Sequence, residues 1–506
     1  MATRSTHWTL LIYLIACIPL LGCTSVYQVR GVEPKLAHDL LVDRIETQDP
    51  AGDAHLIRAV EARSVEPLEL CDSGKQRKLQ ADGSCNMPPG PFKVGILEVD
   101  RHGSLNPKQR RQVFGMLDEE ARSARDDGDN LVILVFIHGW HHGARVCDYN
   151  LACFRRLVGG MANVYGSGRA DGKTPTRFVG IYFAWRGESI DKEGFNVLTI
   201  YNRKRRAEKI GRSGATDVLL DLDEQYRRLR SAAEEEKAKG TVLMVTAGHS
   251  LGGGMLLSAL QSKLVGTVGG TEYIRSSHPR GEPTPGQRPP VGGYGDLSIL
   301  INPAIQAAKF RAFANDLTEV VSDDRLAYAP GQTPTVLVLT SEADRATRRA
   351  FPASRWLLPH NWFRGAAQRK ALGHYRPSRT HELTSTLDVS HEWKRRQRPC
   401  GCPFYVVGDA LAQLPRPKDP ASSFTTKLES VLGQLPLARG APDGADASAP
   451  AYALERVFEP GWDDNAPFWV VRVNENIINS HSDIYNEALM RFLVVFLNTF
   501  FDAKGL

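Results

Sequence analysis

Thr241 to Leu256 read TVLMVTAGHSLGGGML. The first half is a short apolar run rich in Thr and Val, and the second half leads through small residues into an apolar segment, which predicts a buried strand followed at once by a helix. The corner at 248–252 reads GHSLG, the GxSxG pattern in which a serine occupies a strained turn and glycines allow close backbone approach. Such a turn directs helix amides at whatever Ser250 attacks, so the stretch predicts an acyl-transfer site. The alternative is a glycine-rich turn that only closes a strand.

The overall composition is that of a soluble protein with a large core. The chain has 506 residues, of which 42% are hydrophobic and 24% are charged, and its net charge is +6. This length fits two or three average domains, or one long domain with insertions. The small positive surplus does not indicate a nucleic-acid partner.

The N-terminal segment, residues 1–22, predicts an export signal. Arg4 precedes an apolar run from Leu10 to Leu21, which is too short to span a bilayer comfortably. The following Gly22 and Cys23 resemble the lipobox of bacterial lipoproteins. That resemblance implies cleavage before Cys23, a lipid anchor on this cysteine and, because Asp does not follow it, sorting to the outer membrane of the bacterial cell envelope. Ordinary signal cleavage and an uncleaved anchor are the alternatives.

Export to an oxidising compartment favours disulfides among the remaining cysteines. Spacing favours Cys71 with Cys85 and Cys147 with Cys153. Cys400 and Cys402 are separated by one residue, so a bond between them would close a strained ring, and they are expected to be free thiols or to pair elsewhere.

Apolar periodicity predicts an α/β domain around the central strand and helix. A Gly- and Pro-rich loop is predicted at 266–295. Strands are predicted at 93–99, 131–137, 178–184, 297–302, 335–340 and 468–473, and helices at 107–125, 151–164, 204–239 and 484–501.

Polar residues follow several of these strands. The strand at 131–137 ends in His138, Gly139 and Trp140, and the strand at 335–340 ends in Ser341, Glu342, Ala343 and Asp344. His481 lies between the last strand and the closing helix. His138, His141 and His142 also permit a metal site, but the two-histidine helical spacing of a zinc site is absent, so we expect His138 to shape the turn and predict neither a metal nor another cofactor.

The order strand, HGW, strand, GHSLGGG, strand, Asp344, last strand and His481 resembles the α/β-hydrolase superfamily, and within it lipase-like esterases of the bacterial lipoprotein type. The resemblance implies a mostly parallel central sheet with helices on both faces. It also implies a Ser250–His481–Asp344 triad, with the backbone amides of Trp140 and Leu251 as the oxyanion hole. Asn302 ends the preceding strand and cannot serve as the acid. Glu342 is the alternative acid, and a helix N-cap is the alternative role for either carboxylate.

These assignments divide the chain into five parts. Between 351 and 465 the pattern breaks down, and the basic and aromatic residues of 352–399 could face a substrate or anionic lipid, although a solvated insertion is the simpler interpretation. Residues 436–451 resemble a flexible linker. The parts are a signal (1–22), an N-terminal extension (23–90), the first part of the core (91–350), an insertion serving as a possible cap or lid (351–465), and the rest of the core (466–506).

The expected activity is hydrolysis of a small-molecule or lipid carboxylic ester through an acyl-enzyme. An acyltransferase, an amidase or a peptidase would use the same three side chains. A catalytically inactive hydrolase fold that serves as an envelope-bound binding module is the alternative from another class. Because the base must be neutral, activity is expected to decrease as the pH is lowered through the range from about pH 8 to about pH 5, where histidine changes charge.

Overall fold

In the computed structural model, the described residues are 45–48, 54–57, 92–100, 103–140, 142–144, 148–166, 174–185, 210–211, 214–264, 292–311, 332–352, 365–385, 422–435, 451–457 and 466–506.

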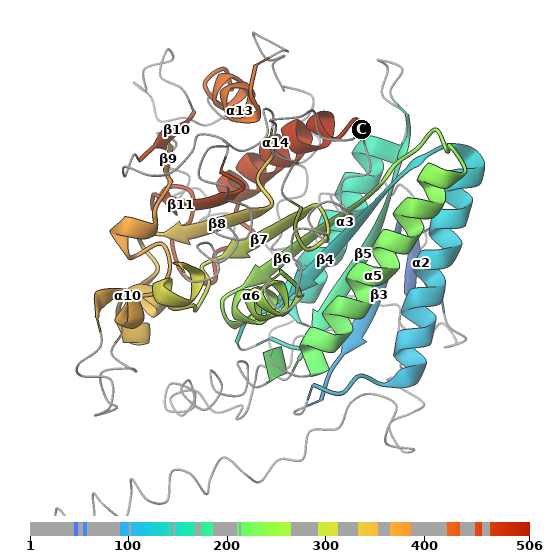
Figure 1. The fold of residues 1–506 in the computed structure, drawn as a ribbon, viewed down its shortest axis with the longest axis horizontal. Helices are drawn as coiled ribbons and strands as arrows, with labels where there is room; N and C mark the ends of the chain where they lie inside the picture. The colour runs from blue at the N-terminus through green and yellow to red at the C-terminus, as the bar shows by residue number, and fades with distance from the viewer. Residues whose placement is uncertain are drawn as a thin grey trace, which may run out of the picture.

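One sheet of eleven strands forms the centre of these residues, in the order β10-β9-β11-β8-β7-β6-β4-β5-β3-β1-β2 (Figure 1). The strands from β9 to β3 in this order run parallel. β10 at one edge and the β1–β2 hairpin at the other pair antiparallel. The strands span β1 Ile45–Gln48, β2 Ala54–Ile57, β3 Phe92–Glu98, β4 Asn130–Ile137, β5 Thr176–Ala184, β6 Val242–His249, β7 Leu297–Ile301, β8 Val336–Ser341, β9 His381–Ser385, β10 Tyr452–Arg456 and β11 Phe468–Val473.

Helices cover both faces of the sheet (Figure 1). One face packs against α2 (Pro107–Asp127), α5 (Gly214–Glu235) and α6 (Leu251–Leu264). The other packs against α3 (Tyr149–Gly166), α13 (Phe424–Leu432) and α14 (Glu487–Ala503). The protein is therefore an α/β protein with a mostly parallel sheet between two helical layers, as the sequence predicted.

The central strands are apolar along their length because both of their faces are buried. All eight residues of β4 are buried. Alternate side chains enter opposite cores: Leu131 and Ile133 lie on the α2 side, whereas Val132 and Leu134 lie on the α3 side. This two-sided burial explains why 131–137 is the clearest strand in the sequence.

The predicted helix at 204–239 is longer than α5, which begins at Gly214 and ends at Glu235. At its end, Lys237 adopts a φ of 52°, in the left-handed region. The Lys237 amide donates to the Glu234 carbonyl, and the Ala238 amide donates to that of Ala233. The helix thus ends near a lysine in the left-handed conformation. A glycine at this position would have indicated the end of the helix in the sequence.

The sequence shows no regular pattern between 351 and 465, yet β9, α13 and β10 lie there. The β9 residues facing inward are His381, Leu383 and Ser385. A five-residue strand with two polar inward side chains leaves no apolar alternation to recognise. Both new strands extend the central sheet, so this part of the insertion belongs to the core. Most of the predicted linker lies outside the described residues.

Parallel strands end at a common edge, and the segments that follow β4, β6, β8 and β11 meet there.

Candidate active site

Ser250 stands between β6 and α6 in a strained backbone conformation. Its φ is 54°, in the left-handed region that β-carbon-bearing residues rarely occupy. Its amide donates to the Ile301 carbonyl at 3.0 Å, and its carbonyl accepts from the Ala304 amide at 3.1 Å. The turn is therefore held by β7 and by the segment that follows it.

The glycines beside Ser250 are required by close packing of backbone. A β-carbon on Gly252 would lie 2.3 Å from the Ile137 carbonyl oxygen, and one on Gly248 would lie 2.9 Å from the Gly253 α-carbon. Neither contact can be relieved by turning a side chain, since backbone is on both sides. The GxSxG spacing thus matches the steric demands of this corner.

His481 connects Ser250 with Asp344 through both ring nitrogens. Its Nε2 lies 2.7 Å from Ser250 Oγ, and its Nδ1 lies 2.8 Å from Asp344 Oδ2. Asp344 and Ser250 are buried, whereas the His481 side chain is 22% exposed. With Asp344 ionised, Nδ1–H donates to the carboxylate and leaves Nε2 to accept the serine proton.

Asp344 is held in its charged form by hydrogen bonds. Burial alone would raise its pKa, but hydrogen bonds from His481 and Thr347 outweigh that effect and lower the pKa below its ordinary value. The Thr347 amide donates to Oδ1 at 3.0 Å, and the Thr347 hydroxyl donates to Oδ2. His374 Nε2 lies 2.9 Å from the same hydroxyl, so it donates to the Thr347 oxygen in turn.

The carbonyl of His481 is held by two further side chains. His249 Nε2 donates to it at 2.9 Å and Asn302 Nδ2 at 3.1 Å. Asn302 Oδ1 accepts from the Ser341 amide at 2.9 Å, which ties the His481 loop to β8. Burial, reinforced by the neighbouring His481, lowers the pKa of His249 well below its ordinary value. A neutral His249 therefore packs against the His481 ring, with the ring centres 5.1 Å apart.

His138 fixes the loop that follows β4, as expected of a residue that shapes this turn. Its Nδ1–H donates to the Gly139 carbonyl at 2.8 Å, and its Nε2 accepts from the Trp185 amide at 3.0 Å. Burial lowers the pKa of His138 to about 4. A β-carbon on Gly139 would lie 2.9 Å from Ser250 Cβ, so this loop packs directly against the serine.

The predicted oxyanion donors adjoin Ser250 on both sides. Trp140 follows Gly139 in the loop that packs on the serine, and Leu251 is the first residue of α6. An amide at the start of a helix is oriented to donate to an anion. The role of these two amides as the oxyanion hole remains a prediction.

Asp344, and not Glu342, faces His481. The Glu342 carboxylate instead contacts Arg472, 2.7 Å away. Asp344 also binds an amide of the following helical turn, as a capping carboxylate does, because Thr347, whose amide donates to Oδ1, lies in the turn Ala346–Ala350. One carboxylate thus caps a turn and binds the histidine.

Sequence reasoning missed Thr347, His374, His249 and Asn302 as supports of this site. The only readable signal was Thr347, three residues after a carboxylate in a capping pattern. Asn302 had been considered only as an acid, a role its amide cannot fill.

Several predictions concern residues outside the described part of the chain. Cys153 is buried in α3, but Cys147 is outside that part, so their pairing stays a prediction. The same holds for Cys71, Cys85, Cys400, Cys402, the lipidation site Cys23 and His141. Within the described residues, no set of three or more His, Cys, Asp or Glu side chains is placed to hold a metal ion, and no helix has the length and hydropathy of a membrane span.

No family model, curated protein or solved structure matches the chain.

Proposed function

We propose that the protein is a serine hydrolase that cleaves carboxylic esters. One observation carries this proposal: His481 lies 2.7 Å from Ser250 Oγ through one nitrogen and 2.8 Å from Asp344 Oδ2 through the other. These three residues lie 94 and 137 positions apart in the chain (250 to 344, 344 to 481). A serine, a base and an acid connected in series are the parts that nucleophilic acyl transfer needs.

The arrangement of the strands supports an α/β-hydrolase fold. Ser250, Asp344 and His481 follow β6, β8 and β11, which is the chain order serine, acid, histidine of that fold. The loop after β4 lies against the serine, where the fold has its second oxyanion donor. The resemblance found in the sequence and the topology of the sheet thus lead to the same proposal.

In the proposed first step, Ser250 Oγ attacks the ester carbonyl while its proton moves to His481 Nε2. The carbonyl electron pair moves to oxygen, where the Trp140 and Leu251 amides stabilise it, each by about 3 kcal/mol. The low pKa of Asp344 keeps that carboxylate charged beside the imidazolium. Collapse of the intermediate expels the alcohol, which takes the proton from His481 and leaves an acyl-enzyme.

In the second step, water takes the place of the alcohol. His481 removes a proton from the water, the oxygen attacks the acyl-enzyme, and Ser250 leaves with the proton that His481 returns. A second alcohol in place of water would make the protein an acyltransferase. The chemistry requires no cofactor.

The test is hydrolysis by the purified full chain of p-nitrophenyl esters with short and long acyl groups, beside the matching anilides. We expect the esters to be cleaved and Ser250→Ala to lower the rate by at least about 10⁴-fold. Ser258→Ala in α6 is the matched control, because the Ser258 hydroxyl donates to the Gly254 carbonyl within that helix. Faster anilide cleavage would identify an amidase instead, and no cleavage or labelling by a serine-reactive probe would identify an inactive binding module.

We also propose that the mature chain begins at Cys23 and is lipid-anchored in the bacterial cell envelope, with the catalytic domain exported. The proposal rests on the signal-like segment at 1–22 and on its lipobox-like end. Membrane fractionation in a bacterial host tests it: the full chain should sediment with the outer membrane, and Cys23→Ala should not. Equal sedimentation of both would contradict lipidation at Cys23.

A further inference from the structure

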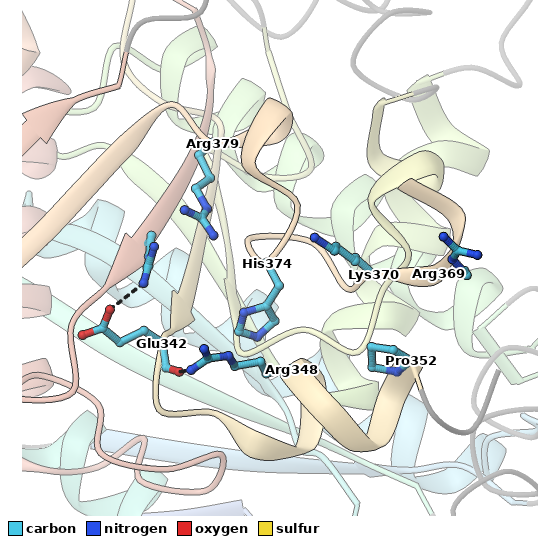
Figure 2. Close-up of a pocket in the computed structure, with 8 residues that line it drawn as sticks. Glu342, Arg348, Pro352, Arg369, Lys370, His374 and Arg379 are labelled. Atoms are coloured by element: carbon cyan, nitrogen blue, oxygen red, sulfur yellow. Dashed lines mark hydrogen bonds and ion pairs between the residues drawn. The ribbon is translucent and has the colours of Figure 1, made fainter. Parts of the chain in front are cut away.

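A cavity of about 740 Å³ opens beside the acid of the triad, at the end of β8 (Figure 2). Its walls come from the segment after β8, from the α10 segment (Ala366–Arg369) with the loop that follows it, and from β11. The lining residues are Glu342, Arg348, Pro352, Arg369, Lys370, His374, Arg379 and Arg472. Its size is in the range of small-molecule sites.

The charge of the cavity is strongly positive. Five of its lining residues are Arg or Lys, against one carboxylate. Arg472 pairs with Glu342 at 2.7 Å, and Arg379 contacts Glu382 at 3.6 Å. The carboxylates of Glu342 and Glu382 are therefore already paired with arginines.

Three cations in the cavity have no acidic partner among the described residues. Among the described residues, the Arg348 side chain donates to the backbone carbonyl of Glu342, at 3.1 Å. Within that part of the chain, the side chains of Arg369 and Lys370 contact no carboxylate. Burial lowers the pKa of His374 to about 4; the nearby Asp344 opposes this shift, and the arginines that line the cavity add to it.

The wall that carries these residues is anchored to the core. The Lys370 carbonyl accepts from the Ala307 amide at 3.1 Å, and the Leu372 amide donates to the Ile305 carbonyl at 2.8 Å. Gly373 has a φ of 83°, and a β-carbon there would lie 2.3 Å from Thr340 Oγ1, so the loop packs tightly on β8. Main-chain hydrogen bonds therefore fix the segment that holds Lys370.

We propose that this cavity binds a ligand bearing a phosphate group, held by Arg348, Arg369 and Lys370. Arginine forks match phosphate oxygens, and a doubly charged group balances the charge of two cations at once. The volume exceeds that of a phosphate ion, which leaves room for an organic part. The same chemistry is offered by a soluble phosphate ester and by a phosphomonoester lipid headgroup.

The site is next to the triad without being part of it. His374 lines the cavity and lies two hydrogen bonds from Asp344, through the Thr347 hydroxyl. Figure 2 shows His374 between Arg348 and the loop that carries Lys370. His374 and Thr347 would connect a ligand in this cavity with Asp344. Because the binding site needs neither Ser250 nor His481, it stands whether or not the protein hydrolyses esters.

The experiment measures binding to the purified full chain at constant ionic strength, with two probes. The first is inorganic phosphate in calorimetry, and the second is phosphatidylcholine vesicles with and without phosphatidate in a sedimentation assay. Variants are Arg369→Gln, Lys370→Gln and the double variant. The matched controls are Arg111→Gln in α2 and Lys239→Gln before β6, exposed cations on elements away from the cavity.

We expect saturable binding of at least one probe, weakened about 3- to 10-fold by each single variant and more by the double variant. The controls should change the affinity less than about 2-fold. Binding of phosphate identifies a soluble ligand, and binding of phosphatidate vesicles alone identifies a headgroup. Binding of neither probe, or equal binding by the wild type and the double variant, would overturn the proposal. Thermal unfolding of each variant checks that a loss of binding is not a loss of fold.

Discussion

The turn that carries Ser250 and the two loops that carry Asp344 and His481 are built from different interactions. Around Ser250 the contacts are between backbone atoms: the serine has a φ of 54°, and a β-carbon on Gly252 would lie 2.3 Å from a carbonyl oxygen. Around Asp344 and His481 the contacts are hydrogen bonds from the side chains of Thr347 and Asn302, among others.

This difference shows what a short motif can encode. Steric demands on backbone exclude nearly every residue but glycine, so they leave a fixed pattern in the sequence. A hydrogen bond to a carboxylate or a carbonyl can come from many donors at many positions, and it leaves no pattern. The backbone contacts around Ser250 form the backbone half of the site, and the hydrogen bonds around Asp344 and His481 form the side-chain half; single substitutions can break either one.

The two halves should act as one catalytic unit. Ser250→Ala and His481→Ala are each expected to lower kcat by about 10⁶-fold, and the double variant should lower it no further. The physical reason is that each residue works only through the hydrogen bond between them, 2.7 Å long. Steady-state kinetics on the best ester measure this. Additive losses would mean that the two side chains act separately.

Breaking the backbone half should cost stability as well as activity. Gly252→Ala places a methyl group against the Ile137 carbonyl and is expected to lower the free energy of unfolding by about 3 kcal/mol or more. Gly254→Ala is the matched control in the same helix, because its β-carbon would meet no atom closer than 3.9 Å. That change should be neutral or stabilise by up to about 1 kcal/mol. Urea unfolding compares the two, and equal stabilities would contradict the steric account.

Protonation of His138, which lies in the loop that packs on Ser250, should make the free energy of unfolding depend on pH. The pKa of His138 is lowered by burial to about 4 in the folded state, against about 6.5 unfolded. The contribution of neutral His138 to the free energy of unfolding is therefore present above pH 6.5 and is lost as the pH falls toward 4. Between pH 7.5 and pH 5 this amounts to about 2 kcal/mol.

The measurement is the free energy of unfolding at both pH values for the wild type and for His138→Gln. The wild type should lose about 2 kcal/mol more than the variant over this interval. The physical cause is burial, which takes a charged imidazole out of water. An equal loss in both proteins would show that His138 does not exclude the proton.

The smallest of these effects is expected when one side-chain hydrogen bond to Asp344 is removed. Thr347→Val removes the hydroxyl that donates to Asp344 and is expected to lower kcat about 10-fold with KM little changed. Thr347→Ser retains a hydroxyl and should restore most of the rate. Kinetics of both variants test a positioning role, which a wild-type kcat in Thr347→Val would exclude.

Much of the core was readable from the sequence, since buried parallel strands are apolar runs and the turn that carries Ser250 needs its glycines. The contact between Thr347 and His374 was not readable, because these residues are 27 positions apart and meet only when the loop before β9 packs on β8. β9 itself was missed because its inward residues include His381 and Ser385. The sequence predicted Asp344 as the acid with Glu342 as the alternative, and in the structure Asp344 contacts His481 whereas Glu342 pairs with Arg472.

The most direct measurement is labelling of the purified protein with a fluorophosphonate, followed by mass spectrometry of the labelled peptide. The account predicts a single labelled residue, Ser250, no labelling in Ser250→Ala, and labelling slowed at least about 10³-fold in His481→Ala. Labelling of Ser250 at the same rate without His481, or labelling of another serine in its place, would contradict it.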